Sequence, residues 1–245
     1  MNTQNLDKDV TPKLKKDTGT KQSQLISKVL SPALKLFLRS QVEQVSQLEV
    51  QISGSNRQIL TGNIPQVLIW AKHAIYQGLH LAQVQLVGEG IRTNLGQVLK
   101  GQPLQLVEPV LVCGELLLHE ADLNASLKSS LLSNALTELL QMLLATNDSV
   151  KGQVSWDKIT VEPNQLTLMG DYLTDGKRTS LLLRCGLQLL NCHELQLTQI
   201  QLQSPNRSLE KLENFQIDLG SHVNLQELTL HPNKLVCRGE ITVMP

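Results

Sequence analysis

The first strong pattern along the chain is helical and begins at Ser23. From there, apolar residues recur at the spacing of one helix face, while three basic residues gather on another side of the same helix. Pro32 interrupts the pattern, so the segment is either one kinked helix or ends in a second helix capped by Ser31. The sequence therefore predicts a basic amphipathic helix over residues 23–40. Its apolar face is Ile26, Leu30, Leu34 and Phe37, and its basic residues are Lys28, Lys35 and Arg39.

After Gln41 the pattern becomes that of β-strands. Residues 79–86 and 195–202 alternate apolar with mostly polar positions, as half-buried strands do. Residues 158–171 align without gaps on residues 227–240, and each segment contains a central Pro-Asn pair. Pro presets φ for the first central position of a turn, and Asn suits the second. We therefore predict an antiparallel meander that uses one hairpin pattern twice.

A second helix is predicted over residues 127–145, where a wide stripe of Leu follows the candidate N-caps Asn124 and Ser126. Polar residues occupy the other side, so this helix is expected to pack on a core and not to span a membrane. Its inner stripe includes Leu132, Leu136, Leu139 and Leu143.

Some Leu-rich strands carry apolar residues on both faces, notably residues 110–118 and 181–190. Sheets buried on both faces normally have helices on both sides, yet the pattern predicts only two or three helices. The sequence thus predicts an α+β fold with an antiparallel sheet whose remaining apolar face needs a cover. The sheet itself, a second copy of the chain, or the acyl chains of a lipid in an elongated groove would each provide it.

The length of 245 residues fits one domain. We assign this domain to residues 23–245. Residues 1–22 are polar and contain several Lys but few large apolar residues, which is typical of a disordered basic tail.

The composition argues against a nucleic-acid partner. Basic and acidic residues balance at 22 each, and the chain has only two Trp, two Tyr and two Phe. Phosphate binding needs clustered cations, and base stacking needs aromatic side chains. The apolar content is instead aliphatic, with 49 Leu.

No motif for catalysis or for a cofactor is present. The nucleophile elbow, the phosphate loop and the dinucleotide fingerprint are all absent as strings. Cys192 and His193 are neighbours on a predicted strand, so their side chains point to opposite faces and do not form a metal site. Glu120 and Asp122 have a spacing that a hydrolase could use, but their place before a helix favours capping. We expect no catalytic residue, no metal and no cofactor.

Cysteine usage indicates a reducing compartment. The four Cys form no C-x-x-C pair, and no secretory signal precedes them. We expect free thiols and a cytoplasmic protein. No stretch reaches the roughly 18 to 20 apolar residues of a membrane-spanning helix.

Six short segments carry a family resemblance. They are Ile26–Leu34, Leu60–Gly62, Ala74–Leu79, Ile91–Gly96, Gly114–Leu118 and Glu120–Leu127. Together they resemble the LmeA-like phospholipid-binding family, and within it the branch found in photosynthetic bacteria. The similarity runs from about Ser23 to the C-terminus and is densest before residue 145.

This resemblance implies a non-enzymatic protein that binds phospholipid at a membrane. It also implies an elongated, strongly curved antiparallel sheet wrapped around helices, similar to tubular lipid-binding domains. Mycobacterial-type members carry an N-terminal export or anchor segment, whereas this chain starts with a polar, Lys-rich segment. A periplasmic location and a role in cell-wall glycan assembly are therefore not carried over, and we expect peripheral attachment to the inner face of a membrane.

The family pattern marks no ligand contact, so the candidate site residues come from the two helices. We expect the apolar and basic residues of the 23–40 helix to face a membrane, and the stripe from Leu132 to Leu143 to contact acyl chains. Packing of the first helix on its own core is the competing interpretation of its pattern. At the level of function, the competing hypothesis is a scaffolding protein whose apolar face joins copies into an oligomer.

Overall fold

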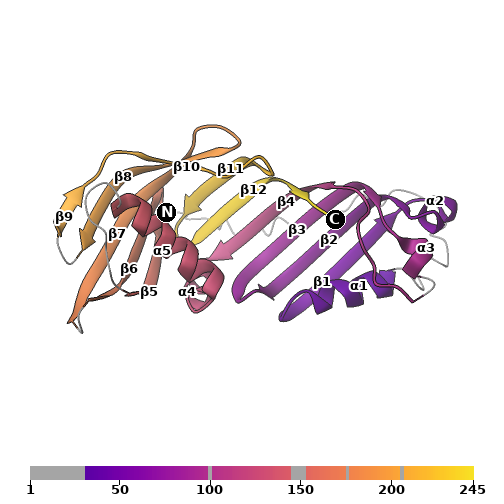
Figure 1. Ribbon diagram of the computed structural model, residues 1–245, viewed down its shortest axis with the longest axis horizontal. Helices are drawn as coiled ribbons and strands as arrows, with labels where there is room; N and C mark the ends of the chain where they lie inside the picture. Colours follow the sequence, from indigo (N-terminus) through magenta and orange to yellow (C-terminus); the bar gives the residue numbers. More distant parts are fainter. Residues whose placement is uncertain (1–30, 99–100, 145–152, 175–176, 205–206) are drawn as a thin grey trace, which may run out of the picture.

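The computed structural model describes residues 31–98, 101–144, 153–174, 177–204 and 207–245 (Figure 1). The predicted 1–22 tail and the first part of the predicted 23–40 helix lie outside this range. The helices of the described residues are α1 (Ser31–Ser40), α2 (Asn56–Leu60), α3 (Leu95–Val98), α4 (Glu120–Ser126) and α5 (Ser130–Leu144).

The strands form two antiparallel sheets that follow one another along the long axis of the molecule (Figure 1). The first contains, in spatial order, β1 (Gln44–Ser53), β2 (Asn63–Tyr76), β3 (Leu79–Arg92), β4 (Val110–His119), β12 (Lys234–Val243) and β11 (Val223–His231). The second contains β10 (Phe215–Asp218), β8 (Glu194–Ser204), β7 (Lys177–Leu189), β6 (Gln165–Thr174) and β5 (Gln153–Glu162), while β9 (Arg207–Lys211) pairs with β8.

The predicted α+β class is confirmed: long antiparallel strands dominate, and neither sheet closes into a barrel. The short helices α2 and α3, of five and four residues, were not predicted. The helix predicted over residues 127–145 is α5, which starts at Ser130, and α4 lies directly before it. In Figure 1, α1 lies in front of the first sheet, and α5 lies in front of the second.

The two hairpins predicted from the repeated pattern form as expected, as β5–β6 and β11–β12. Asn164 and Asn233 occupy the left-handed region at the turns, with φ of 59° and 61°. The hairpins also meet each other. The Asn233 N–H donates to the Val161 carbonyl at 2.9 Å, and the Asn164 N–H donates to the Leu230 carbonyl at 3.3 Å. The sheets are therefore joined where the repeated turns meet.

Helix α4 completes this joint by satisfying the free edge of β5. The Asn124 side-chain amide donates to the Ile159 carbonyl at 2.7 Å, and its oxygen accepts from the Ile159 N–H at 2.9 Å. Glu120 Oε2 accepts from the Val161 N–H at 2.8 Å. Partly buried backbone groups of an edge strand need such partners, so these two side chains take the place of a further strand.

Helix α5 covers the second sheet and fills its interior. Leu140 and Leu143 are buried, and the half-buried Leu132, Leu136 and Leu139 pack against the same cluster. The sheet contributes fully buried residues such as Leu183 and Cys185. Burial raises the pKa of the Cys185 thiol to about 11, so this side chain is an uncharged core residue at neutral pH. The second sheet thus has a closed aliphatic core.

We predict that Asn124→Ala destabilises the fold by about 2 kcal/mol, because it leaves both backbone groups of Ile159 without their partner. Asn134→Ala is the matched control, since Asn134 lies exposed on α5. Urea denaturation followed by circular dichroism measures both. Equal stabilities of the two variants would contradict the role assigned to Asn124 at the joint.

Candidate functional site

An apolar groove lies between α1 and the face of the first sheet that α1 covers. It has two adjoining sections, which we call the wide and the narrow section, with volumes of about 360 and 250 Å³. Both sections are half-open, and they share Leu38, Gln41, Ile69 and Leu86. The two sections therefore adjoin, the wide one beneath α1 and the narrow one next to its C-terminal end.

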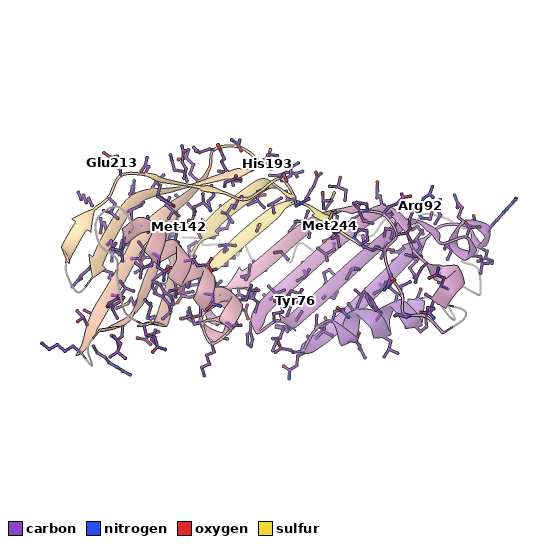
Figure 2. The ribbon with its side chains drawn as sticks, viewed as in Figure 1. Tyr76, Arg92, Met142, His193, Glu213 and Met244 are labelled. Carbon is purple, nitrogen blue, oxygen red and sulfur yellow. The ribbon has the colours of Figure 1, made fainter. Side chains whose placement is uncertain are left out.

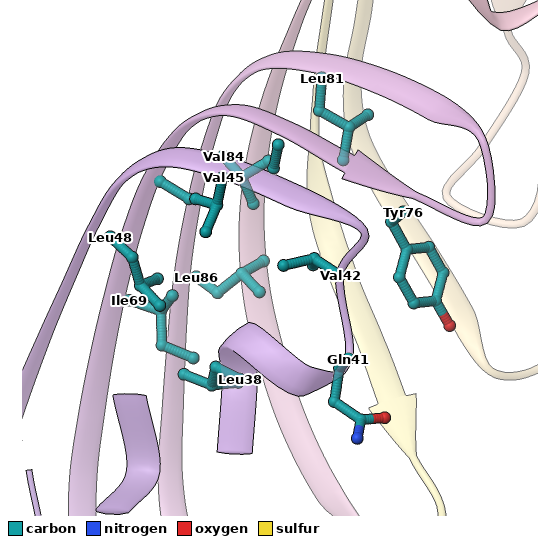
Figure 3. Close-up of a pocket in the computed structure, with 12 residues that line it drawn as sticks. Leu38, Gln41, Val42, Val45, Leu48, Ile69, Tyr76, Leu81, Val84 and Leu86 are labelled. Carbon is teal, nitrogen blue, oxygen red and sulfur yellow. The ribbon is translucent and has the colours of Figure 1, made fainter. Parts of the chain in front are cut away.

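Aliphatic side chains make up most of the wall. The wide section is lined by α1 and by strands β2, β3, β4 and β12, including Leu34, Phe37, Ile64, Val67, Ile91, Val110, Val112, Ile241 and Val243. The narrow section, shown in Figure 3, is lined by residues of β1, β2 and β3, including Val45, Leu48, Ala71, Ala74, Tyr76, Leu81 and Val84.

The alternation of the strands places these side chains on one face. In β2, Val67, Ile69 and Ala71 are two apart and share a face. Ala74 is three residues beyond Ala71 and would point away in a regular strand, but His73 lies between them with a φ of 47°. This departure from β geometry allows both alanines to face the groove.

The opposite face of the first sheet is largely polar. Arg238 pairs with Glu115 at 3.1 Å and with Glu227 at 3.4 Å, and Gln66 donates to Glu89 at 3.0 Å. As expected for residues 110–118, β4 places apolar side chains on both faces, since Leu111 and Leu117 lie opposite to Val110 and Val112. Glu115, between Leu111 and Leu117 on the outer face, pairs with Arg238 and keeps that face solvated. One side of this sheet meets water, and the other meets the groove.

No ionisable acid or base of the described residues lines the groove apart from the phenol of Tyr76. The other polar side chains in the wall are Gln41, Thr93 and Gln105. Small-molecule sites usually have volumes of about 300 to 1,000 Å³ and few polar groups. As far as the described residues line it, the groove is thus suited to an aliphatic ligand.

The structure divides the predicted site residues between two places. Leu34 and Phe37 line the wide section, while Lys35 and Arg39 lie on other sides of α1. Ile26, Lys28 and Leu30 are outside the described residues. The α5 stripe from Leu132 to Leu143 packs on the second sheet, and neither section of the groove includes it.

The two carboxylates considered for hydrolysis have structural partners. Asp122 accepts from the His119 N–H at 3.0 Å in a capping box, as expected for a residue at a helix start. Glu120 is bonded to the edge of β5. Among the residues that the structure describes, no cluster of His, Cys, Asp or Glu could hold a metal ion. In the same part of the chain, every helix is too short or too polar to cross a membrane.

Sequence patterns did not identify the strand residues of the groove. The alternation of residues 79–86 indicated that one face of β3 is apolar, and Leu86 does line the groove. That pattern cannot distinguish a face covered by its own helix from a face left partly open. The difference between the two faces becomes visible only once the described parts of α1 and α5 are placed on their sheets.

Comparison with known proteins gives one result. The model of one protein family, described as LmeA-like phospholipid-binding, matches residues 21–240. No curated protein and no solved structure matches the chain.

We predict that two Leu→Ala substitutions lower the free energy of unfolding by different amounts. Leu183→Ala removes a fully buried side chain from a closed core and should destabilise the protein by about 4 kcal/mol. Leu86→Ala removes a half-buried side chain that borders an existing space, so its cost should be about 1.5 kcal/mol. Urea denaturation of delipidated protein measures both. A cost for Leu86→Ala as large as that for Leu183→Ala would mean that the groove is filled.

Proposed function

Since the chain belongs to the LmeA-like phospholipid-binding family, we propose that the groove beneath α1 holds the acyl chains of a phospholipid. The observation that carries this proposal is a half-open groove of two adjoining sections with a mainly aliphatic wall. Acyl chains gain about 0.8 kcal/mol for each methylene that leaves water, so such a wall supports binding without any specific polar contact.

The proposed binding involves no chemical change in the lipid. This part of the proposal is supported by the absence of carboxylates, imidazoles and thiols from the groove wall among the described residues. It is also supported by the structural partners of Glu120 and Asp122. The α5 stripe enters the proposal only as packing for the second sheet, because its leucines face that core.

Helix α1 is the element that we propose to meet the membrane. Leu36 is 72% exposed, Phe37 is 38% exposed at the wide section, and Lys35 and Arg39 are on the same helix. An apolar side chain next to cations is the usual composition of an interfacial helix. The cytoplasmic leaflet is rich in anionic lipids, so its surface is the one that we propose for this protein.

We predict that Leu86→Gln weakens phospholipid binding at least fivefold, because an amide that the lipid buries without a partner costs about 1 to 3 kcal/mol. Val87→Gln is the matched control, since its neighbouring position on β3 points to the opposite face of the sheet. The measurement is titration of delipidated protein with pyrene-labelled phosphatidylglycerol, supported by native mass spectrometry of the protein purified under mild conditions.

Two results would contradict the proposed function. One is protein that never carries or takes up lipid. The other is self-association, seen as a sedimentation mass that rises with protein concentration, which is lost in Leu86→Gln. In that case a second copy of the chain, and not a lipid, would cover the groove.

We further predict that Lys35→Gln with Arg39→Gln lowers affinity for vesicles of phosphatidylglycerol and phosphatidylcholine at least tenfold. Each basic residue near anionic headgroups contributes about 1 kcal/mol. Lys177→Gln with Arg178→Gln removes the same charge from the second sheet and serves as the control. Vesicle co-sedimentation measures the effect, and an equal loss in both double variants would exclude α1 as the contact.

A further inference from the structure

The two ends of the groove differ in polarity. Thr93 and Gln105 lie in the wall of the wide section, where residues 93 and 106 form an isolated β-bridge. The narrow section has buried Ala71, Ala74 and Val84 in its wall. Gln41 and the phenol of Tyr76 also border the narrow section, but the surface that this section presents is apolar. The phenol is on a side chain that is 43% exposed, and it accepts from the Gln77 side chain at 3.2 Å. A ligand with one polar and one apolar end therefore has a preferred direction.

The chain's own side chains fill the space beyond the narrow section. Strands β2 and β3 turn at Gln77 and Gly78, and this turn packs on α4. The His80 N–H donates to Ser126 Oγ at 2.8 Å, and a Cβ on Gly78 would lie 2.7 Å from Ser129 Cβ. Past this contact lies the closed core under α5. The groove thus ends at the turn and does not continue into the second sheet.

Among the residues that β2 contributes to the wall, the smallest lie close to this end. Ala71 and Ala74 are in the narrow section, the larger Ile64 and Val67 are in the wide section, and Ile69 borders both. Ala71 and Ala74 are 7% and 4% exposed, so each forms the floor of the groove and not its rim. Any larger side chain at these two positions would occupy the space of about 250 Å³ that the narrow section provides.

We propose that a bound phospholipid lies with its glycerol and headgroup at Thr93 and Gln105, and that Ala71 and Ala74 limit the length of the acyl chain. This inference rests on the proposed function, because it assumes that acyl chains occupy the groove. It adds a direction of binding and a residue pair that determines specificity.

The test compares two phosphatidylglycerols that differ only in chain length, the dilauroyl and the distearoyl lipid. Each methylene kept out of apolar surroundings weakens binding about fourfold. Ala74→Leu should therefore weaken binding of the distearoyl lipid at least tenfold and leave that of the dilauroyl lipid within about twofold. Val112→Leu adds bulk in the wide section and should change both affinities by the same factor.

Leu81→Ala is the second variant. If Ala74→Leu does not fold, Leu81→Ala tests whether the narrow section limits the length of the bound acyl chain. It enlarges the same end of the groove and should strengthen binding of the distearoyl lipid relative to the dilauroyl lipid. Methyl NMR of the wild-type protein tests the direction. A spin label at the end of the acyl chain should broaden the Ala74 methyl signal more than that of Val112, and a headgroup label should do the reverse.

The outcomes separate the two proposals. If the wild-type protein binds neither lipid, the proposed function fails and this inference falls with it. If both lipids bind but Ala74→Leu and Leu81→Ala change both affinities equally, the inference is overturned and the proposed function stands. If the headgroup label broadens Ala74 most, the proposed direction is overturned.

Discussion

The structure depends on how much aliphatic surface each helix can remove from water. Both sheets present a face of Leu, Ile and Val to a helix, the first sheet to α1 and the second to α5. Helix α5 closes its sheet into a core in which Leu183, Ile200 and Leu202 have no exposure. Between α1 and the first sheet a half-open groove remains. The same aliphatic surface thus forms a closed core in one half and the wall of a groove in the other.

The joint between the halves combines backbone and side-chain hydrogen bonds. Figure 2 shows the side chains of the described residues on the ribbon of both halves. The Asn233 carbonyl accepts from the Glu120 N–H at 2.8 Å, and the Asn233 N–H donates to the Val161 carbonyl of β5. One residue thus connects a turn, a helix and a strand. These bonds fix where the closed core stops. Because α4 both holds this joint and packs on the β2–β3 turn, it also determines where the groove ends.

Much of the fold could be predicted from the sequence, because hydrophobic period and turn chemistry are local signals. The two Pro-Asn hairpins and the helix over residues 130–144 follow from such signals. The site could be predicted only in part. The sequence analysis selected Leu34 and Phe37 as membrane-facing residues, and the structure places both in the wall of the groove. The strand residues of the wall were missed, because a covered and an open sheet face show the same alternation of apolar and polar residues. Ala74 could not be placed, since its direction depends on the unusual φ of His73.

The origin of the groove wall has a consequence for protein synthesis. Leu34 is near the start of the fold, whereas Ile241 and Val243 belong to β12, which pairs with β4 through contacts such as Val110 with Val243. Such distant pairing forms late, because a long loop must close before the contact is gained. Until β12 emerges from the ribosome and docks, the wide section lacks one side. A nascent chain therefore has no complete groove, and the uptake of lipid that we propose would have to follow the translation of β12.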